Sequence, residues 1–119
     1  MFTTRLYVQV FRDRMVVRNI TAGTSIERYA TTAFSHSRSL IGSFSEARAT
    51  LKAAVAGVTS GILPKRLRLV LHPMEMVEGG LSEVENRVFL ELCNGVRSVR
   101  TVVWVGPTLS DEGVIEMVR

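Results

Sequence analysis

The sequence has few cysteines, few lysines and no long hydrophobic run. Its single cysteine, Cys93, excludes an internal disulfide and favours a reducing compartment. No stretch approaches the roughly 18 consecutive apolar residues that a membrane-spanning helix needs. The first residues alternate apolar and polar side chains, unlike the continuous apolar centre of a secretion signal. We therefore expect a soluble, cytoplasmic protein without a membrane span.

The chain does have the length and apolar content of one folded domain. Its 119 residues, 46% of them hydrophobic, can bury a core without disulfides or a structural metal. Neither an internal repeat nor a linker-like segment interrupts it. The expectation is a single domain spanning residues 1–119.

Positive charge is carried almost entirely by arginine and is unevenly distributed. Residues 1–40 and residues 41–72 each have a net charge of +4, whereas residues 73–119 have a net charge of −4. A dipolar surface of this kind suits self-association or an acidic partner at least as well as nucleic acid.

Residue periodicity predicts strands first and then strands alternating with helices. Alternating or continuous apolar patterns predict five strands, at residues 3–11, 14–20, 25–34, 66–71 and 99–105. The last of these is nearly all apolar, which is typical of a strand covered on both faces. Helical periodicity predicts a helix over residues 44–59, a second over about residues 82–94 and a short last helix within residues 108–119.

Turn and cap residues support these boundaries. Ser43 and Ser82 each stand three residues before a glutamate, which is the pattern of a capping box. Gly61 fits the end of the first helix, and Pro64 prevents its continuation. Thr108 or Ser110 is expected to cap the last helix.

The predicted order is βββαβαβ plus a short C-terminal helix. The first three strands should form an antiparallel meander, and the helical crossovers should add parallel strands. The fold class is therefore α/β, or α+β with a mixed five-stranded sheet.

Three segments carry a family resemblance: SLIGSFSEARATLKAAV (39–55), PKRLRLVLHP (64–73) and LSEVENRVFLELCNGVRSVRTVVWVGP (81–107). They resemble segments of the MreB family of actin-like, rod shape-determining proteins. In that family GVIADF precedes a helix, the next strand ends in VP, and the following helix leads to a strand ending in EEP. The resemblance implies a ribonuclease H-like, actin-like ATPase fold, restricted to its first subdomain.

The same resemblance exposes what has changed at the nucleotide site. The family carries an Asp-x-Gly-Thr phosphate loop at its first hairpin, and the matching residues 9–12 here read QVFR. An amide replaces the acid, and phenylalanine stands where close approach of the backbone to phosphate needs glycine. The family's EEP corresponds to VGP at residues 105–107. The resemblance therefore implies a degenerate nucleotide site with no cofactor, no metal and no catalytic residue.

The candidate binding residues are Arg12 and Arg14 at the hairpin tip and Arg18 on the second strand. They could bind an anion or an acidic partner. The alternative is a solvated turn in which Asp13 serves as the local counterion.

The other residues whose side chains could take part in catalysis or binding are expected to serve the fold instead. His36 and His72 lack a second ligand at metal-binding spacing, and Cys93 lies on the apolar face of a helix. The same expectation covers loop residues Ser35, Ser37, Ser39, Gly79 and Gly80, and the aromatic residues Phe89 and Trp104.

Three function classes remain open. The first is a non-enzymatic module that binds proteins in a cell-shape or cytoskeletal context, with an actin-like protein or a second copy of itself as partner. The second is a basic nucleic-acid-binding module, which the acidic final third and the scarcity of lysine disfavour. The third is a small hydrolase, for which no nucleophile–base set stands out.

Overall fold

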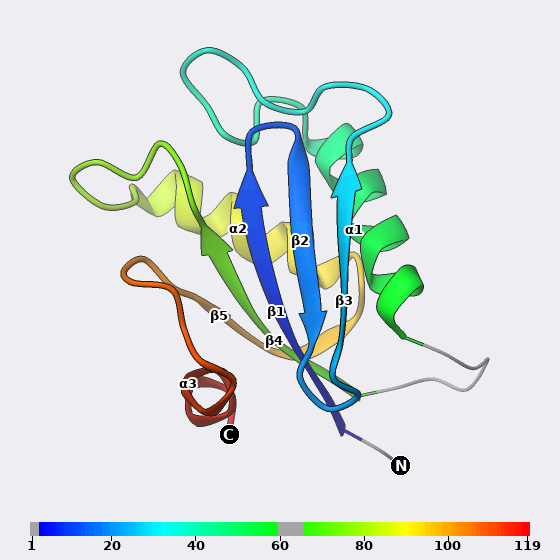
Figure 1. Ribbon diagram of the computed structural model, residues 1–119. Coiled ribbons are helices and arrows are strands. Elements are labelled where there is room, and N and C mark those ends of the chain that lie inside the picture. Colours follow the sequence, from blue (N-terminus) through cyan, green and yellow to red (C-terminus); the bar gives the residue numbers. More distant parts are fainter. Residues whose placement is uncertain (1–2, 60–65) are drawn as a thin grey trace.

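The computed structural model describes residues 3–59 and 66–119 (Figure 1). Its elements are β1 (Thr3–Phe11), β2 (Arg14–Asn19), β3 (Thr24–Tyr29), α1 (Phe44–Val58), β4 (Arg66–Pro73), α2 (Glu83–Asn94), β5 (Ser98–Val103) and α3 (Asp111–Met117). This order is βββαβαβ with a C-terminal helix, as predicted. Gly61 and Pro64 lie outside the described residues.

The five strands form one mixed sheet in the order β3-β2-β1-β4-β5. β1 pairs antiparallel with β2, and β2 pairs antiparallel with β3. β1 pairs parallel with β4, and β4 pairs parallel with β5. The predicted meander and the predicted parallel additions are both confirmed.

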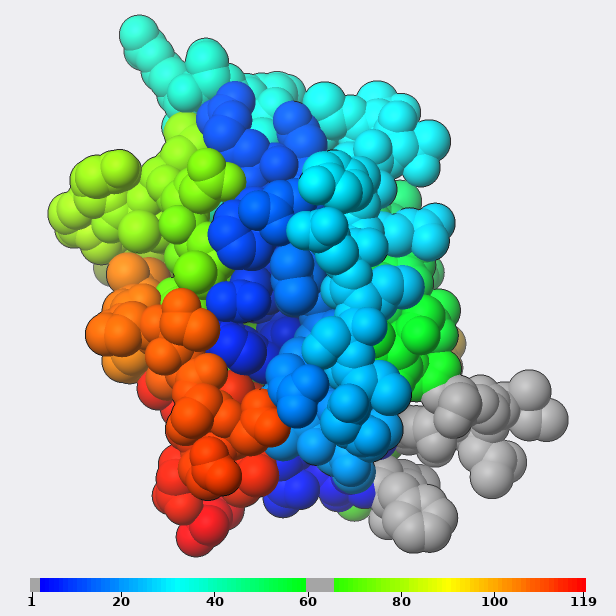
Figure 2. All heavy atoms as spheres, viewed as in Figure 1, coloured from blue at the N-terminus to red at the C-terminus, as the bar shows by residue number. Residues whose placement is uncertain are grey.

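Helices cover the two faces of the sheet unequally. α1 and α2 lie together on one face, behind the strands in Figure 1, and α3 lies on the other face beside β1 and β4. Figure 2 shows that the β1–β3 region is at the molecular surface on the α3 side, because no helix crosses it.

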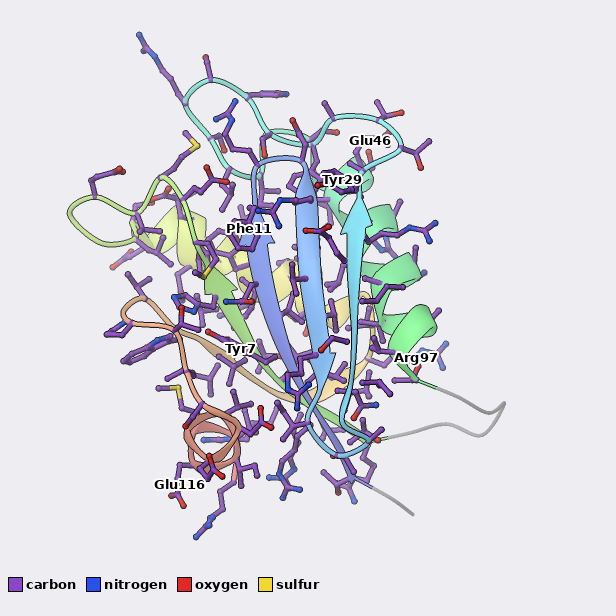
Figure 3. All side chains as sticks on the ribbon, in the orientation of Figure 1. Tyr7, Phe11, Tyr29, Glu46, Arg97 and Glu116 are labelled. Carbon is purple, nitrogen blue, oxygen red and sulfur yellow. The ribbon has the colours of Figure 1, made fainter. Side chains whose placement is uncertain are left out.

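Strand alternation explains the core. Leu6, Val8 and Val10 are fully buried against the α1–α2 layer, while the intervening side chains leave β1 on the α3 face. Figure 3 shows Phe11 near the hairpin tip and Tyr7 lower on the same strand. Tyr7 belongs to a second, smaller core with Val114 of α3.

Two strand predictions need correction. The third strand ends at Tyr29 rather than at residue 34, since its last ladder contact is the Ala30 N–H donated to the Asp13 carbonyl. The chain then turns back over the hairpin tip. The fifth strand is only partly covered: Val102 packs against the smaller core beneath α3, but no residue of β5 is buried and Val99 is 52% exposed.

Of the two predicted capping boxes, one is present and one is absent. Ser82 accepts from the Glu85 N–H, and the Glu85 carboxylate accepts from the Ser82 N–H, so the second capping box is present. The first is wrong. The Ser43 side chain makes no cap bond, and its N–H already donates to the Phe34 carbonyl, which leaves that donor unavailable to a glutamate. Of the two candidates for α3, Ser110 is the cap.

Within the described ranges, no helix has the length and apolar character to cross a membrane.

Candidate functional site

The tip of the β1–β2 hairpin is anchored by the loop between β3 and α1. Asp13 has φ 56°, in the left-handed region that Asp and Asn tolerate best among side-chain-bearing residues. Its Oδ1 accepts from the N–H groups of Phe34 and Ser35 at 2.9 and 2.8 Å. Its own N–H donates to Ser35 Oγ at 3.2 Å. Asp13 therefore orders this loop, a role that the sequence did not reveal.

Arg12 joins the hairpin tip to the same β3–α1 loop and to the loop between β4 and α2. Its N–H donates to Glu75 Oε2 at 2.6 Å. Its guanidinium donates to the His36 carbonyl at 3.1 Å and to Met76 Sδ at 3.3 Å. Arg12 is exposed, and within its guanidinium Nη1 is engaged by these contacts.

Arg14 and Arg18 each pair with an acid of the same chain. Arg14 lies 2.8 Å from Glu27, and its guanidinium stands 3.9 Å above the Phe11 ring. Arg18 donates from Nε and Nη2 to the two carboxylate oxygens of Asp111 at 2.9 and 3.0 Å. This hydrogen-bonded pair raises the pKa of Arg18 and lowers the pKa of Asp111.

The three predicted arginines thus point to three different partners and form no common binding centre. Their binding of an anion or acidic partner stays a prediction, and it would require ligand groups to share or displace the internal contacts.

The place that resembles a phosphate loop is occupied by ordinary side-chain contacts. Gln9 donates to Met74 Sδ at 3.6 Å, and Phe11 lies beneath Arg14. Across residues 3–59 and 66–119, no three His, Cys, Asp or Glu side chains are grouped so that they could hold a metal ion. The absence of catalysis and of a cofactor stays a prediction.

Tyr7 and His72 form a buried polar chain that connects the sheet to the C-terminal segment. His72 is 2% exposed, and its Nε2 lies 2.9 Å from the Gly106 carbonyl. Because a carbonyl only accepts, Nε2 carries the proton and Nδ1 accepts from the Tyr7 hydroxyl at 2.6 Å. The Tyr7 oxygen in turn accepts from the Leu109 N–H at 3.1 Å.

Burial lowers the pKa of His72 below its ordinary value, because the charged imidazolium would lose hydration; the bond to Gly106 opposes this effect. The neutral ring is therefore the favoured form in the folded protein. The structural role predicted for His72 is supported by this network, which also explains why the histidine tolerates burial.

The remaining candidates fit structural positions. Cys93 is fully buried, and burial raises the pKa of its thiol to about 12, which disfavours the reactive thiolate. Phe89 belongs to the main core, and half-buried Trp104 packs against the smaller core. Ser35 is buried in the hairpin anchor, whereas His36 is exposed.

A surface depression lies on the sheet face that α1 and α2 cover, where the start of α1 faces α2. It has a volume of about 600 Å³, and its lining includes Phe44, Val84 and Val88 with the charged side chains of Arg87 and Glu91. A smaller hollow of about 200 Å³ adjoins it and shares Val84 and Val88. Phe44 is 39% exposed and Val84 is 73% exposed. We call this feature the α1–α2 groove.

The sequence reading missed the α1–α2 groove. The residue in the sequence that could have indicated the groove is Val84. It stands outside the core stripe of α2 but on the same side of the helix as Val88, four residues later. An apolar residue there widens the apolar surface of α2 beyond what the sheet covers.

Comparison with curated proteins gives a match over nearly the whole chain. The chain is 32% identical over 124 residues to the uncharacterized protein YjaA of Escherichia coli (strain K12), and the match covers 96% of each chain. No family model matches the chain, and no solved structure matches it.

Proposed function

The chain belongs to the family of the uncharacterized protein YjaA, and we propose that it is a non-catalytic protein-binding module built on an actin-like subdomain. The observation that carries the binding part of the proposal is the α1–α2 groove. An exposed apolar surface of this kind is typical of protein-interaction sites, since leaving it in water is unfavourable.

Three features support the actin-like and non-catalytic parts. The strand order with three antiparallel strands followed by two parallel ones is compatible with a ribonuclease H-like sheet. Gln9 and Phe11 occupy the place where the resemblance expects an acid and a glycine. The nearby Asp13 carboxylate accepts two backbone N–H groups and is thereby committed to holding a loop.

The composition of the α1–α2 groove fits a second copy of the chain as occupant. Glu83, Arg87 and Glu91 follow one another at four-residue spacing, so they form one row along α2. In an antiparallel, two-fold packing of α2 on its copy, Arg87 of each chain can face Glu83 of the other. Val84 then lies near the centre of the contact, where apolar residues contribute most.

The resemblance supplies a second partner, an actin-like protein of the MreB family. Such a partner would use the same apolar centre, with the cell-shape or cytoskeletal role that this resemblance implies. Fold alone does not establish that role.

Sedimentation velocity of wild type and Val84→Glu tests the proposal. Val84 is mostly exposed in the single chain, so a charged residue there should leave the fold intact, and a thermal unfolding curve checks this. We expect wild type to associate reversibly and Val84→Glu to weaken association about tenfold or more, because it places a carboxylate in the apolar centre.

The matched control is Val99→Glu, which adds the same charge at a 52% exposed valine of β5. It should associate like wild type. Equal loss in both variants would reject the α1–α2 groove as the contact surface. A wild type that stays monomeric at every concentration and does not bind a purified MreB-family protein would overturn the binding proposal itself.

A further inference from the structure

A row of three arginines crosses the sheet at the amino end of the parallel strands. Arg5 of β1 pairs with Arg68 of β4, and Arg68 pairs with Arg100 of β5. Paired residues on neighbouring strands send their side chains to the same face. The three side chains therefore leave the sheet side by side on the face that carries α3, where like charges destabilise one another.

The arginine row has no acidic counterpart. In the part of the chain that the structure describes, no carboxylate lies within 4.0 Å of any of the three guanidiniums. The Nε atoms of Arg5 and Arg68 are buried and make no hydrogen bond there. A buried guanidinium donor without an acceptor destabilises the fold. Contacts within the described chain therefore leave the hydrogen-bonding needs of the arginine row unmet.

Part of the arginine row supports the carboxyl end of α3. Arg68 Nη1 donates to the Val118 carbonyl at 3.0 Å, and Arg100 Nη2 donates to the Met117 carbonyl at 3.5 Å. A helix end presents only about half a negative charge, which does not balance three full positive charges. Arg5 makes neither contact, so capping of α3 does not account for its place in the row.

We propose that Arg5, Arg68 and Arg100 form a binding site for the phosphate group of a small molecule. Guanidinium groups present planar sets of N–H donors that match phosphate oxygens. Arg5 and Arg68 are half-buried, which reduces screening by salt and favours a compact anion. Arg66, two residues before Arg68 and on the same face, adds positive charge at the exposed side.

This arginine row is separate from both sites discussed above. It lies at the opposite end of β1 from the hairpin tip, beside the carboxyl end of α3. The arginine row lies on the face of the sheet that carries α3, whereas the α1–α2 groove lies on the face that α1 and α2 cover. Phosphate binding and self-association can therefore be lost independently.

Thermal unfolding and calorimetric titration with inorganic phosphate and pyrophosphate test the proposal, with chloride replaced at constant ionic strength. We expect a saturable rise of several degrees in the thermal midpoint of the wild type. Arg5→Gln should weaken binding at least tenfold. Arg38→Gln, at an exposed loop arginine, is the matched control and should bind as wild type does.

Arg5→Gln also separates binding from structural support. Removing one of three adjacent positive charges should leave the thermal midpoint without phosphate unchanged or higher, while the response to phosphate is lost. Arg68→Gln should also lose the response, although it gives up the bond to Val118. A phosphate response that survives Arg5→Gln would overturn the proposal.

Two further arms identify other phosphate sources. A shift with ATP–Mg²⁺ that Arg12→Ala abolishes and Arg5→Gln preserves would move the phosphate site to the hairpin tip and overturn the proposal. Binding of a single-stranded oligonucleotide without any response to phosphate or pyrophosphate would overturn it as well.

Discussion

The hydroxyl group of Tyr7 is a single side-chain group whose removal should measurably lower the stability of the fold. It accepts from the N–H of partly buried Leu109 and donates to Nδ1 of buried His72. Tyr7→Phe should lower the free energy of unfolding by about 1–3 kcal/mol, because it leaves polar groups unpaired. Urea denaturation measures the difference.

Tyr29→Phe is the matched control for this change. Tyr29 is 66% exposed, so loss of its hydroxyl should alter the free energy of unfolding by less than about 0.5 kcal/mol. Equal effects of the two substitutions would show that the Tyr7–His72 chain does not secure the C-terminal segment.

His72 should make stability depend on pH. Its pKa in the folded protein lies below the ordinary value of 6.5, so the unfolded chain binds more protons between those two pKa values. The stabilisation is fully present above about pH 6.5 and is lost as the pH falls through the folded pKa. Urea denaturation at a series of pH values should therefore show stability decreasing on acidification.

The comparison that isolates His72 uses two variants. His72→Gln should flatten the pH dependence between about pH 7.5 and about pH 5, whereas His36→Gln, at an exposed loop position, should keep it. A pH dependence that is the same in wild type and His72→Gln would contradict the role of the buried ring.

Residue types alone could predict that His72 is structural, but could not identify its partners. Tyr7 lies 65 positions away and Leu109 a further 37 beyond His72. Such partners meet only through the parallel pairing of β1 with β4 and the docking of α3. Asp13 is similar, because its two N–H donors come from a loop more than 20 residues later.

At the scale of single elements, the two predicted capping boxes make a direct comparison. Ser82→Ala should lower the free energy of unfolding by about 0.5–2 kcal/mol, because the N–H of Glu85 loses its acceptor. Ser43→Ala should cost less, since the Ser43 side chain makes no cap bond. Urea denaturation of both variants checks the order, and a larger loss for Ser43→Ala would contradict the assignment.

The same pair shows why element boundaries are harder to predict than elements. The serine–glutamate spacing is identical at both helices. However, ψ is 105° at Ser43 and 165° at Ser82, and the Ser43 N–H donates to the Phe34 carbonyl. The third strand is another case. Its residues are strand-like through Phe34, but Asp13 binds the chain at Phe34 and Ser35 and removes it from the sheet.

At the scale of the whole molecule, local pattern predicted the order and direction of the strands but not what the finished surface would present. Which strands neighbour one another decides that Arg5, Arg68 and Arg100 stand in one row. Likewise, the α1–α2 groove arises where the start of α1 approaches α2, and in the sequence only Val84, outside the core stripe of α2, points to it. Both features depend on packing between distant segments, and single-segment periodicity does not contain that information.

Salt dependence should distinguish a protein-binding module from a nucleic-acid-binding module. Contact through Phe44 and Val84 buries apolar surface, and its exposed charged rim contributes little and is easily screened. We expect the dissociation constant of self-association, measured by sedimentation, to change less than about tenfold between about 50 and about 200 mM salt. A nucleic-acid-binding module contacting several phosphates would lose about a thousandfold or more in affinity over the same range. The protein-binding proposal would be rejected in favour of a nucleic-acid-binding module by two results together. The chain would not self-associate, and it would bind an oligonucleotide tightly with this steep loss of affinity as salt increases.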